Sequence, residues 1–196
     1  MSELPPIPNY LCEAVDDFAA SIEYLVEPIE RACQIVTQTL LNDGKVLVCG
    51  NGYASPIAGL LTTCLMHQQE FERPSLPAIN LSADSSTISA IAKDGNYHNV
   101  FAKQIRAMGN PGDCLIVLSI DGNCGNIVQA AQTAHEKNIH VIAINGFENG
   151  KISDLKLEDD IEIALKANST ARATEAMLIT SNALCNQIET ELFGVT

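Results

Sequence analysis

The sequence predicts an α/β fold: a five-stranded, mostly parallel sheet with helices on both faces and a helical pair at the N-terminus. From Lys45 onward, short apolar runs alternate with longer amphipathic segments. This is the pattern of parallel strands joined by crossover helices. A glycine-rich turn at residues 48–52 closes the first apolar run and opens the next helix. Such turns bring backbone amides close to a bound anion at a helix N-terminus.

The N-terminal segment is expected to be helical before the sheet begins. Apolar residues recur at helical spacing over residues 9–41, and Pro28 interrupts that period. Proline is tolerated in the first turn of a helix but not in its interior, so we expect two helices. The sequence Asn42-Asp43-Gly44 then provides a cap and a turn.

The remaining elements follow from apolar runs bounded by glycine, proline and polar turns. We expect strands at 45–49, 78–81, 114–118, 140–144 and 161–165, and helices at 56–67, 85–93, 99–108, 126–137 and 170–193. Residues 1–44 would form the N-terminal helices used in oligomer packing, and residues 45–196 the α/β domain. Together the two parts would make one structural unit.

Composition excludes several function classes. The 196 residues suit one domain with its own core. A formal net charge of −13 argues against direct nucleic-acid binding, because phosphate contacts need clustered lysine and arginine. An acidic chain can still meet a basic protein partner.

The cysteines and the apolar runs indicate a cellular compartment. The seven cysteines are odd in number and form no Cys-x-x-Cys pair, which indicates free thiols in a reducing environment. No apolar run reaches the roughly 18 residues of a membrane span, and no signal peptide opens the chain. We therefore expect a cytoplasmic protein with no membrane partner.

Three loops are expected to lie together at the carboxyl ends of the strands. They are residues 50–56, 82–86 and 119–125, which follow the first three strands. In open parallel sheets, ligands bind outside this edge. The sequence therefore predicts a ligand site there.

These loops carry a family resemblance. The chain resembles the phosphoheptose isomerases and the related DnaA initiator-associating proteins, both within the sugar isomerase (SIS) domain superfamily. The resemblance runs over nearly the whole chain. The motifs that carry it are Cys49-Gly50-Asn51-Gly52, Glu72-Arg73-Pro74-Ser75-Leu76-Pro77-Ala78, Asp84-Ser85-Ser86, Lys103-Gln104-Ile105-Arg106-Ala107, Pro111-Gly112-Asp113, Gly122-Asn123, Thr170-Ala171-Arg172 and Leu192-Phe193-Gly194.

The resemblance also implies a zinc site and a catalytic Glu, whose positions hold other residues in this chain. The family's helix after the glycine turn carries a zinc-binding His and, four residues on, a catalytic Glu. Those positions hold Leu60 and Cys64, and the two further family positions on the last helix hold Thr174 and Met177. Isomerisation needs a base and a group that polarises the carbonyl, which Leu60 and Met177 cannot supply. We therefore expect no cofactor and no catalytic residue of the family type.

Cys64 leaves two alternatives open. It could act as a soft ligand or as a base, which would require a depressed pKa and partners such as His67. It could equally be a small buried thiol, since cysteine is among the most buried residue types.

The phosphate loop of the family is also altered. Where the family runs Ser-Thr-Ser-Gly-Asn-Ser, this chain has Ile120, Asp121 and Cys124 in place of three hydroxyl residues. Asp121 would repel a phosphate by about 1 kcal/mol or more at roughly 4 Å. The polar or loop positions that could still hold a ligand are Asn51, Gly52, Ser55, Ser85, Asp94, Ser119, Asp121, Cys124 and Arg172. Arg172 could instead cap or pair near the start of the last helix.

These replacements predict a non-catalytic SIS-domain protein that binds a DnaA-type replication initiator or a sugar phosphate. The alternative is a D-sedoheptulose 7-phosphate isomerase in the synthesis of heptose for lipopolysaccharide. The resemblance also implies a homotetramer with clefts between chains.

Overall fold

The computed structural model describes residues 6–69 and 71–194, so residues 1–5 and 195–196 of the two expected parts lie outside it. Its centre is one sheet of five strands in the order β2-β1-β3-β4-β5, and every neighbouring pair is parallel. The strands are β1 Val46–Gly50, β2 Ala78–Asn80, β3 Cys114–Ser119, β4 His140–Asn145 and β5 Ile161–Ala164. The predicted five-stranded parallel fold is confirmed.

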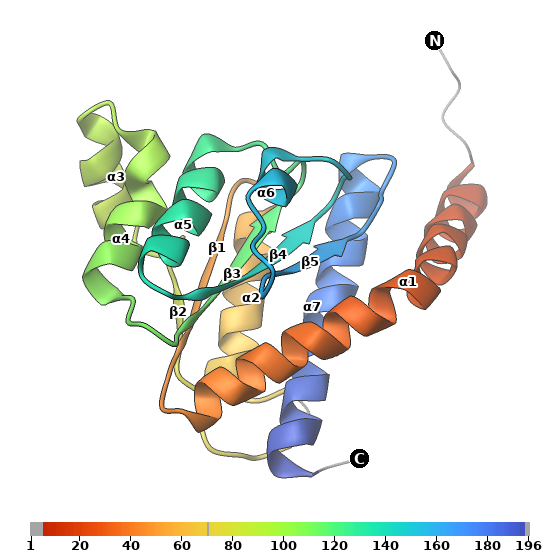
Figure 1. Ribbon diagram of the computed structural model, residues 1–196. Coiled ribbons are helices and arrows are strands. Elements are labelled where there is room, and N and C mark those ends of the chain that lie inside the picture. Colours follow the sequence, from red (N-terminus) through yellow and green to blue (C-terminus); the bar gives the residue numbers. More distant parts are fainter. Residues whose placement is uncertain (1–5, 70, 195–196) are drawn as a thin grey trace.

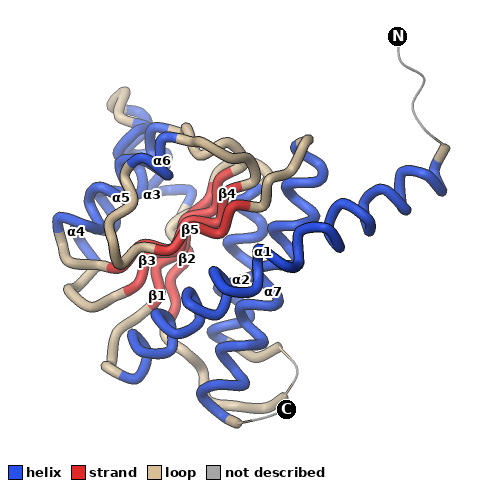
Figure 2. The backbone as a smooth tube through the Cα atoms, turned by 45° about the vertical axis from the view of Figure 1, so that its right-hand side comes forward, coloured by secondary structure: helices blue, strands red, loops and turns tan. Residues whose placement is uncertain are grey.

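Seven α-helices surround this sheet within the described residues. They are α1 Ile7–Leu41, α2 Ala54–Met66, α3 Ser85–Lys93, α4 Val100–Met108, α5 Gly125–Glu136, α6 Lys151–Asp154 and α7 Thr170–Phe193, with a short 3₁₀ turn η1 at Tyr97–Asn99. Helices α1, α2 and α7 cover one face of the sheet, and α3 to α6 cover the other (Figures 1 and 2). Their placement gives three layers.

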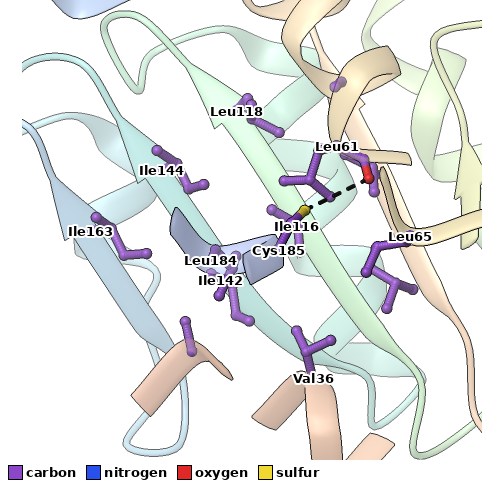
Figure 3. Close-up of a cluster of buried hydrophobic side chains, with 14 of the residues drawn as sticks. Val36, Leu61, Leu65, Ile116, Leu118, Ile142, Ile144, Ile163, Leu184 and Cys185 are labelled. Atoms are coloured by element: carbon purple, nitrogen blue, oxygen red, sulfur yellow. Dashed lines mark hydrogen bonds between the residues drawn. The ribbon is translucent and has the colours of Figure 1, made fainter. Parts of the chain in front are cut away.

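The core follows from the alternation of side chains along buried strands. In β3, Ile116 and Leu118 point toward the layer of α1, α2 and α7, while Leu115 and Val117 point toward the other helical layer. The register continues this across the sheet, with Ile116 beside Ile142 of β4. Figure 3 shows the first of these cores between β3, β4, β5 and the helices α1, α2 and α7.

The N-terminal segment differs from the prediction, because α1 is a single helix of 35 residues with Pro28 inside it. Buried residues occur on both sides of Pro28, among them Leu25 and Ala32. The two turns that flank the proline thus pack on the same body, and this packing holds the helix continuous. The N-terminal half of α1 extends beyond the rest of the molecule (Figures 1 and 2).

Most other boundaries match the predicted ranges to within two residues, although α6 was not predicted. All seven cysteines lie in the described residues, and none forms a disulfide. Among the helices of the described chain, none combines the length and apolar content that crossing a membrane requires.

Candidate functional site

The loops after β1 and β2 are joined through Ser82. The amide of Gly50 donates to Ser82 Oγ at 3.1 Å, and the same hydroxyl donates to the Gly50 carbonyl at 2.9 Å. Ser82 is thereby committed to the backbone of the glycine turn. Its position directly after a strand was the only sequence signal for this role.

The loop after β1 is also joined to the start of α5, which follows β3. Asn51 Nδ2 donates to Asn126 Oδ1 at 2.7 Å, and Asn126 Nδ2 returns a hydrogen bond to Asn51 Oδ1 at 2.9 Å. Gly52, the next residue, has a φ of +52°, a left-handed conformation that favours glycine. The structure therefore brings the three predicted loops together at the carboxyl edge of the sheet.

The loop after β3 uses its polar groups internally. Ser119 is buried, and its Oγ accepts from the Gly122 amide at 2.9 Å. The exposed carboxylate of Asp121 accepts from the Asn123 amide at 2.9 Å, and the Cys124 thiol lies 3.9 Å from the same oxygen. An anion entering this loop would meet both a negative charge and an amide that already has an acceptor.

The N-terminus of α5 faces an imidazole that the sequence reasoning did not place there. A Cβ built on Gly125 would overlap the ring of His98, so that ring packs directly against the first turn of the helix. Ser85 and Asp94 lie at the start and the C-cap of the neighbouring α3, and both are exposed. Ser55 lies in the first turn of α2, close to the glycine turn.

Arg172 is committed to a different part of the molecule. Its guanidinium donates to the Tyr10 carbonyl at 2.7 Å and to Glu175 Oε2 at 2.6 Å, and it stacks 4.1 Å from the centre of the Tyr10 ring. Asp17 of α1 lies 3.8 Å from Arg172 Nε. These contacts hold the N-terminal part of α1 on α7 and border a groove of about 680 Å³ between the two helices.

The four positions at which the resemblance implies the zinc and catalytic residues lack a set of zinc ligands in this chain. Leu60 has no donor atom, Met177 is fully buried in the apolar core, and the Thr174 hydroxyl donates to the Thr170 carbonyl at 2.7 Å. Zinc in proteins takes thiolate, imidazole or carboxylate ligands. Only Cys64 among the four positions offers one. Within residues 6–69 and 71–194, no three or more His, Cys, Asp or Glu side chains converge for a metal.

Cys64 has the depressed pKa that an active thiol requires. A hydrogen bond with the Cys185 side chain lowers the pKa of Cys64, and the positive charge of Arg73 acts in the same direction. Burial and the charge of Glu189 oppose the shift, and the resulting pKa is about 7. The same contact and burial raise the pKa of Cys185 well above its usual value.

A buried ion pair beside Cys64 was not foreseen from the sequence. Arg73 Nε lies 2.8 Å from Glu189 Oε1, and each side chain is 1% exposed. The guanidinium also donates to the carbonyls of Cys64, Leu65 and Pro74 at 2.5 to 2.9 Å. Arg73 therefore ties the segment before β2 to α2 and α7, and its motif gave no sign of a distant carboxylate partner.

Comparison with known proteins identifies relatives across the whole fold. The SIS domain family matches residues 9–146 of this chain. A protein from Chromohalobacter salexigens named phosphoheptose isomerase is 42% identical over 183 residues, which is 93% of each chain. One of the same name from Colwellia psychrerythraea is 42% identical over 97% of both chains.

Solved structures agree with these sequence matches. The structure of a phosphoheptose isomerase from Francisella tularensis has a TM-score of 0.92 and 34% identity, and the match covers 97% of this chain and all of the other. The match confirms the predicted resemblance. The names of the relatives favour the isomerase alternative over the non-catalytic interpretation.

Proposed function

Because this chain belongs to the phosphoheptose isomerase family of SIS-domain proteins, we propose that it recognises a phosphorylated sugar at the carboxyl edge of its sheet. The observation that carries the proposal is the near full-length match, at 40 to 42% identity, to proteins named phosphoheptose isomerase. The convergence of the three loops supports it, because such edges are where parallel sheets bind ligands.

The first candidate activity is the isomerisation of D-sedoheptulose 7-phosphate. The sugar's phosphate would lie near the start of α5, where backbone amides and the His98 ring face the loop. A base must remove the proton beside the carbonyl. Cys64, with a pKa of about 7, is the group at the family's carboxylate position that can take up a proton near neutral pH. This candidate needs no metal bound by Leu60 or Met177.

The second candidate is binding without turnover, with a DnaA-type initiator protein as the partner. It is favoured by the loss of donor atoms at Leu60 and Met177 and by the carboxylate of Asp121 in the phosphate loop. The excess negative charge of the chain suits a basic surface on such a partner.

Assembly as a homotetramer is part of both candidates. Apolar side chains on α1 are exposed in the single chain, with Ile7 76%, Val15 68% and Ile22 50% accessible. They lie on the helix that extends beyond the body, beside the groove between α1 and α7. Burying such a face is the usual reason for symmetric assembly. A monomeric mass in analytical ultracentrifugation would contradict this part of the proposal.

The deciding experiment is turnover of sedoheptulose 7-phosphate by the purified chain, with added zinc and with a chelator, beside the Colwellia relative as a control. Turnover supports the first candidate, and Cys64→Ser should then abolish it. Calorimetric binding of the sugar phosphate without turnover supports recognition of the sugar without catalysis and leaves a protein partner to be tested with the initiator itself. Absence of both, with an active control, refutes sugar-phosphate recognition.

A matched variant tests the altered loop in either case. Asp121→Ser replaces the carboxylate with the hydroxyl that the family has at this position. Removing about 1 kcal/mol of repulsion should tighten sugar-phosphate binding roughly fivefold. Unchanged affinity would show that the phosphate does not approach this loop.

A further inference from the structure

Cys64 and Cys185 meet where α2 packs against α7. Cys185 Sγ lies 4.0 Å from the Leu61 carbonyl of α2. Figure 3 marks this contact with a dashed line. Cys64 follows one turn further along the same helix, and the two cysteines belong to the same buried cluster. Two thiols from helices far apart in sequence therefore lie close together in the reduced chain, and each shifts the pKa of the other.

The surroundings distinguish the two thiols. Arg73 donates to the Cys64 carbonyl, and its charge favours a thiolate at Cys64. Glu189 acts against the thiolate from α7, as does burial. The balance leaves Cys64 with a pKa of about 7 while that of Cys185 is raised. Cys64 is also the more accessible, at 8% exposure against 1% for Cys185.

We propose that Cys64 is a site of oxidation by peroxides and that Cys185 resolves the product as a disulfide between α2 and α7. A thiolate beside a second thiol is the arrangement of reversibly oxidised cysteines. The proposal does not depend on sugar-phosphate recognition, because it concerns only the chemistry of the two sulfurs. It adds a modification site at the position where the family has its catalytic carboxylate.

The reaction balances with one peroxide. The Cys64 thiolate attacks a peroxide oxygen, the O–O bond breaks, and the hydroxide released takes up a proton to leave as water. Cys64 is then a sulfenic acid. The Cys185 sulfur attacks the Cys64 sulfur, the S–O bond breaks, and the Cys185 proton leaves with the hydroxyl as a second water. Both sulfurs are oxidised, and both peroxide oxygens are reduced.

The test is peptide mapping by mass spectrometry of the full chain after exposure to hydrogen peroxide. Cys12 is exposed and Cys124 is half-buried, so a parent carrying Cys12→Ser and Cys124→Ser removes the two most accessible competing thiols. The expected product is a peptide pair linked through Cys64 and Cys185 that a dithiol reductant separates. Recovery of both as free thiols, with Cys12 or Cys124 oxidised in the natural chain, would overturn the proposal.

Two variants in that parent separate the roles of the thiols. Cys185→Ala should leave a sulfenic acid at Cys64 that dimedone traps, whereas Cys64→Ser should give neither dimedone adduct nor disulfide. Alkylation of Cys64 in the parent should reach half its maximal rate near pH 7, below the roughly 8.5 of an ordinary thiol. A midpoint at the ordinary value, or a disulfide that forms without Cys64, would refute the assignment. The mapping of the natural chain decides the matter even if a variant fails to fold.

Discussion

Replacing Glu189 by Ala should destabilise the fold strongly, because it leaves a buried cation unpaired. The Arg73 side chain is 1% exposed, and Glu189 supplies the carboxylate that its Nε contacts at 2.8 Å. The same carboxylate oxygen also accepts from the Gln69 amide at 3.0 Å. Glu189→Ala thus removes the counter-ion of one buried charge and the acceptor of one amide. Breaking a buried pair in this way costs about 3–5 kcal/mol.

Urea unfolding followed by far-UV circular dichroism measures this cost by linear extrapolation. For a chain of this size, the same loss lowers the melting temperature by roughly 6–20 °C. The pairing with Arg73 is tested by the double variant Arg73→Met with Glu189→Leu. Since no charge is then left buried, the double variant should lose less unfolding free energy than the two single variants lose in sum.

The control is a second ion pair of the same chain at the surface. Glu148 and Lys166 lie 3.0 Å apart, and their side chains are 50% and 46% exposed. Glu148→Ala should therefore cost only about 0–1 kcal/mol. A Glu189→Ala variant no less stable than Glu148→Ala would refute the argument that burial sets the cost.

Three further predictions test the loops. Gly52→Ala should lower the free energy of unfolding, measured in urea, by about 1–2 kcal/mol. The left-handed φ of Gly52 is the only source of this cost, because an added Cβ meets no atom within 4 Å. A larger loss would mean that the Cβ does meet neighbouring atoms. Asn51→Ala should lower the free energy of unfolding by about 1–3 kcal/mol, since it leaves Nδ2 of the buried Asn126 without its acceptor. Adding Asn126→Ala should cost little more. Asp84→Asn tests pH dependence. Hydrogen bonds from the Thr87 hydroxyl and amide lower the pKa of Asp84. The stabilisation of the fold by this carboxylate is therefore complete above the ordinary carboxyl pKa, and it is lost as the pH falls through the lowered pKa of the folded state. The gap between the stability–pH curves of the parent and Asp84→Asn should therefore close as the pH falls below about 4, and a gap that stays constant through this range would contradict the argument.

The sheet was predictable because its strands are short apolar runs between clear turn signals. β3 is buried along its whole length, and the helices that flank it carry one apolar side each. The continuity of α1 was not predictable from local preference. A proline in a helix interior costs about 3 kcal/mol, and burial of Leu25 and the turns beyond Pro28 offsets it. Burying one leucine alone contributes about 1.5–3 kcal/mol.

The candidate site was predictable only in part, for a different reason. The loops follow from the strand ends, but their polar partners are distant in sequence. Asn51 pairs with a residue 75 positions away, and Arg172 with a carbonyl 162 positions away. Neither periodicity nor spacing reveals such a pair, so the sequence left Arg172 open between a ligand role and a packing role. In the single chain its donors serve the packing of α1 on α7.

Position 64 shows why restoring one family residue would not restore the family's chemistry. A carboxylate at this position would lie near Glu189 and would need a cation of its own. Arg73 is a weak candidate for this role, because four of its five N–H groups already donate to Glu189 and to three backbone carbonyls. A bound metal could balance that charge, but Leu60 gives this chain no ligand to hold one. A thiol avoids the conflict, since it is neutral when protonated and carries a charge only when Arg73 and Cys185 stabilise the thiolate. Cys64→Glu alone should therefore destabilise the α2–α7 contact, and a gain of zinc-dependent turnover in that variant would refute this account of the position.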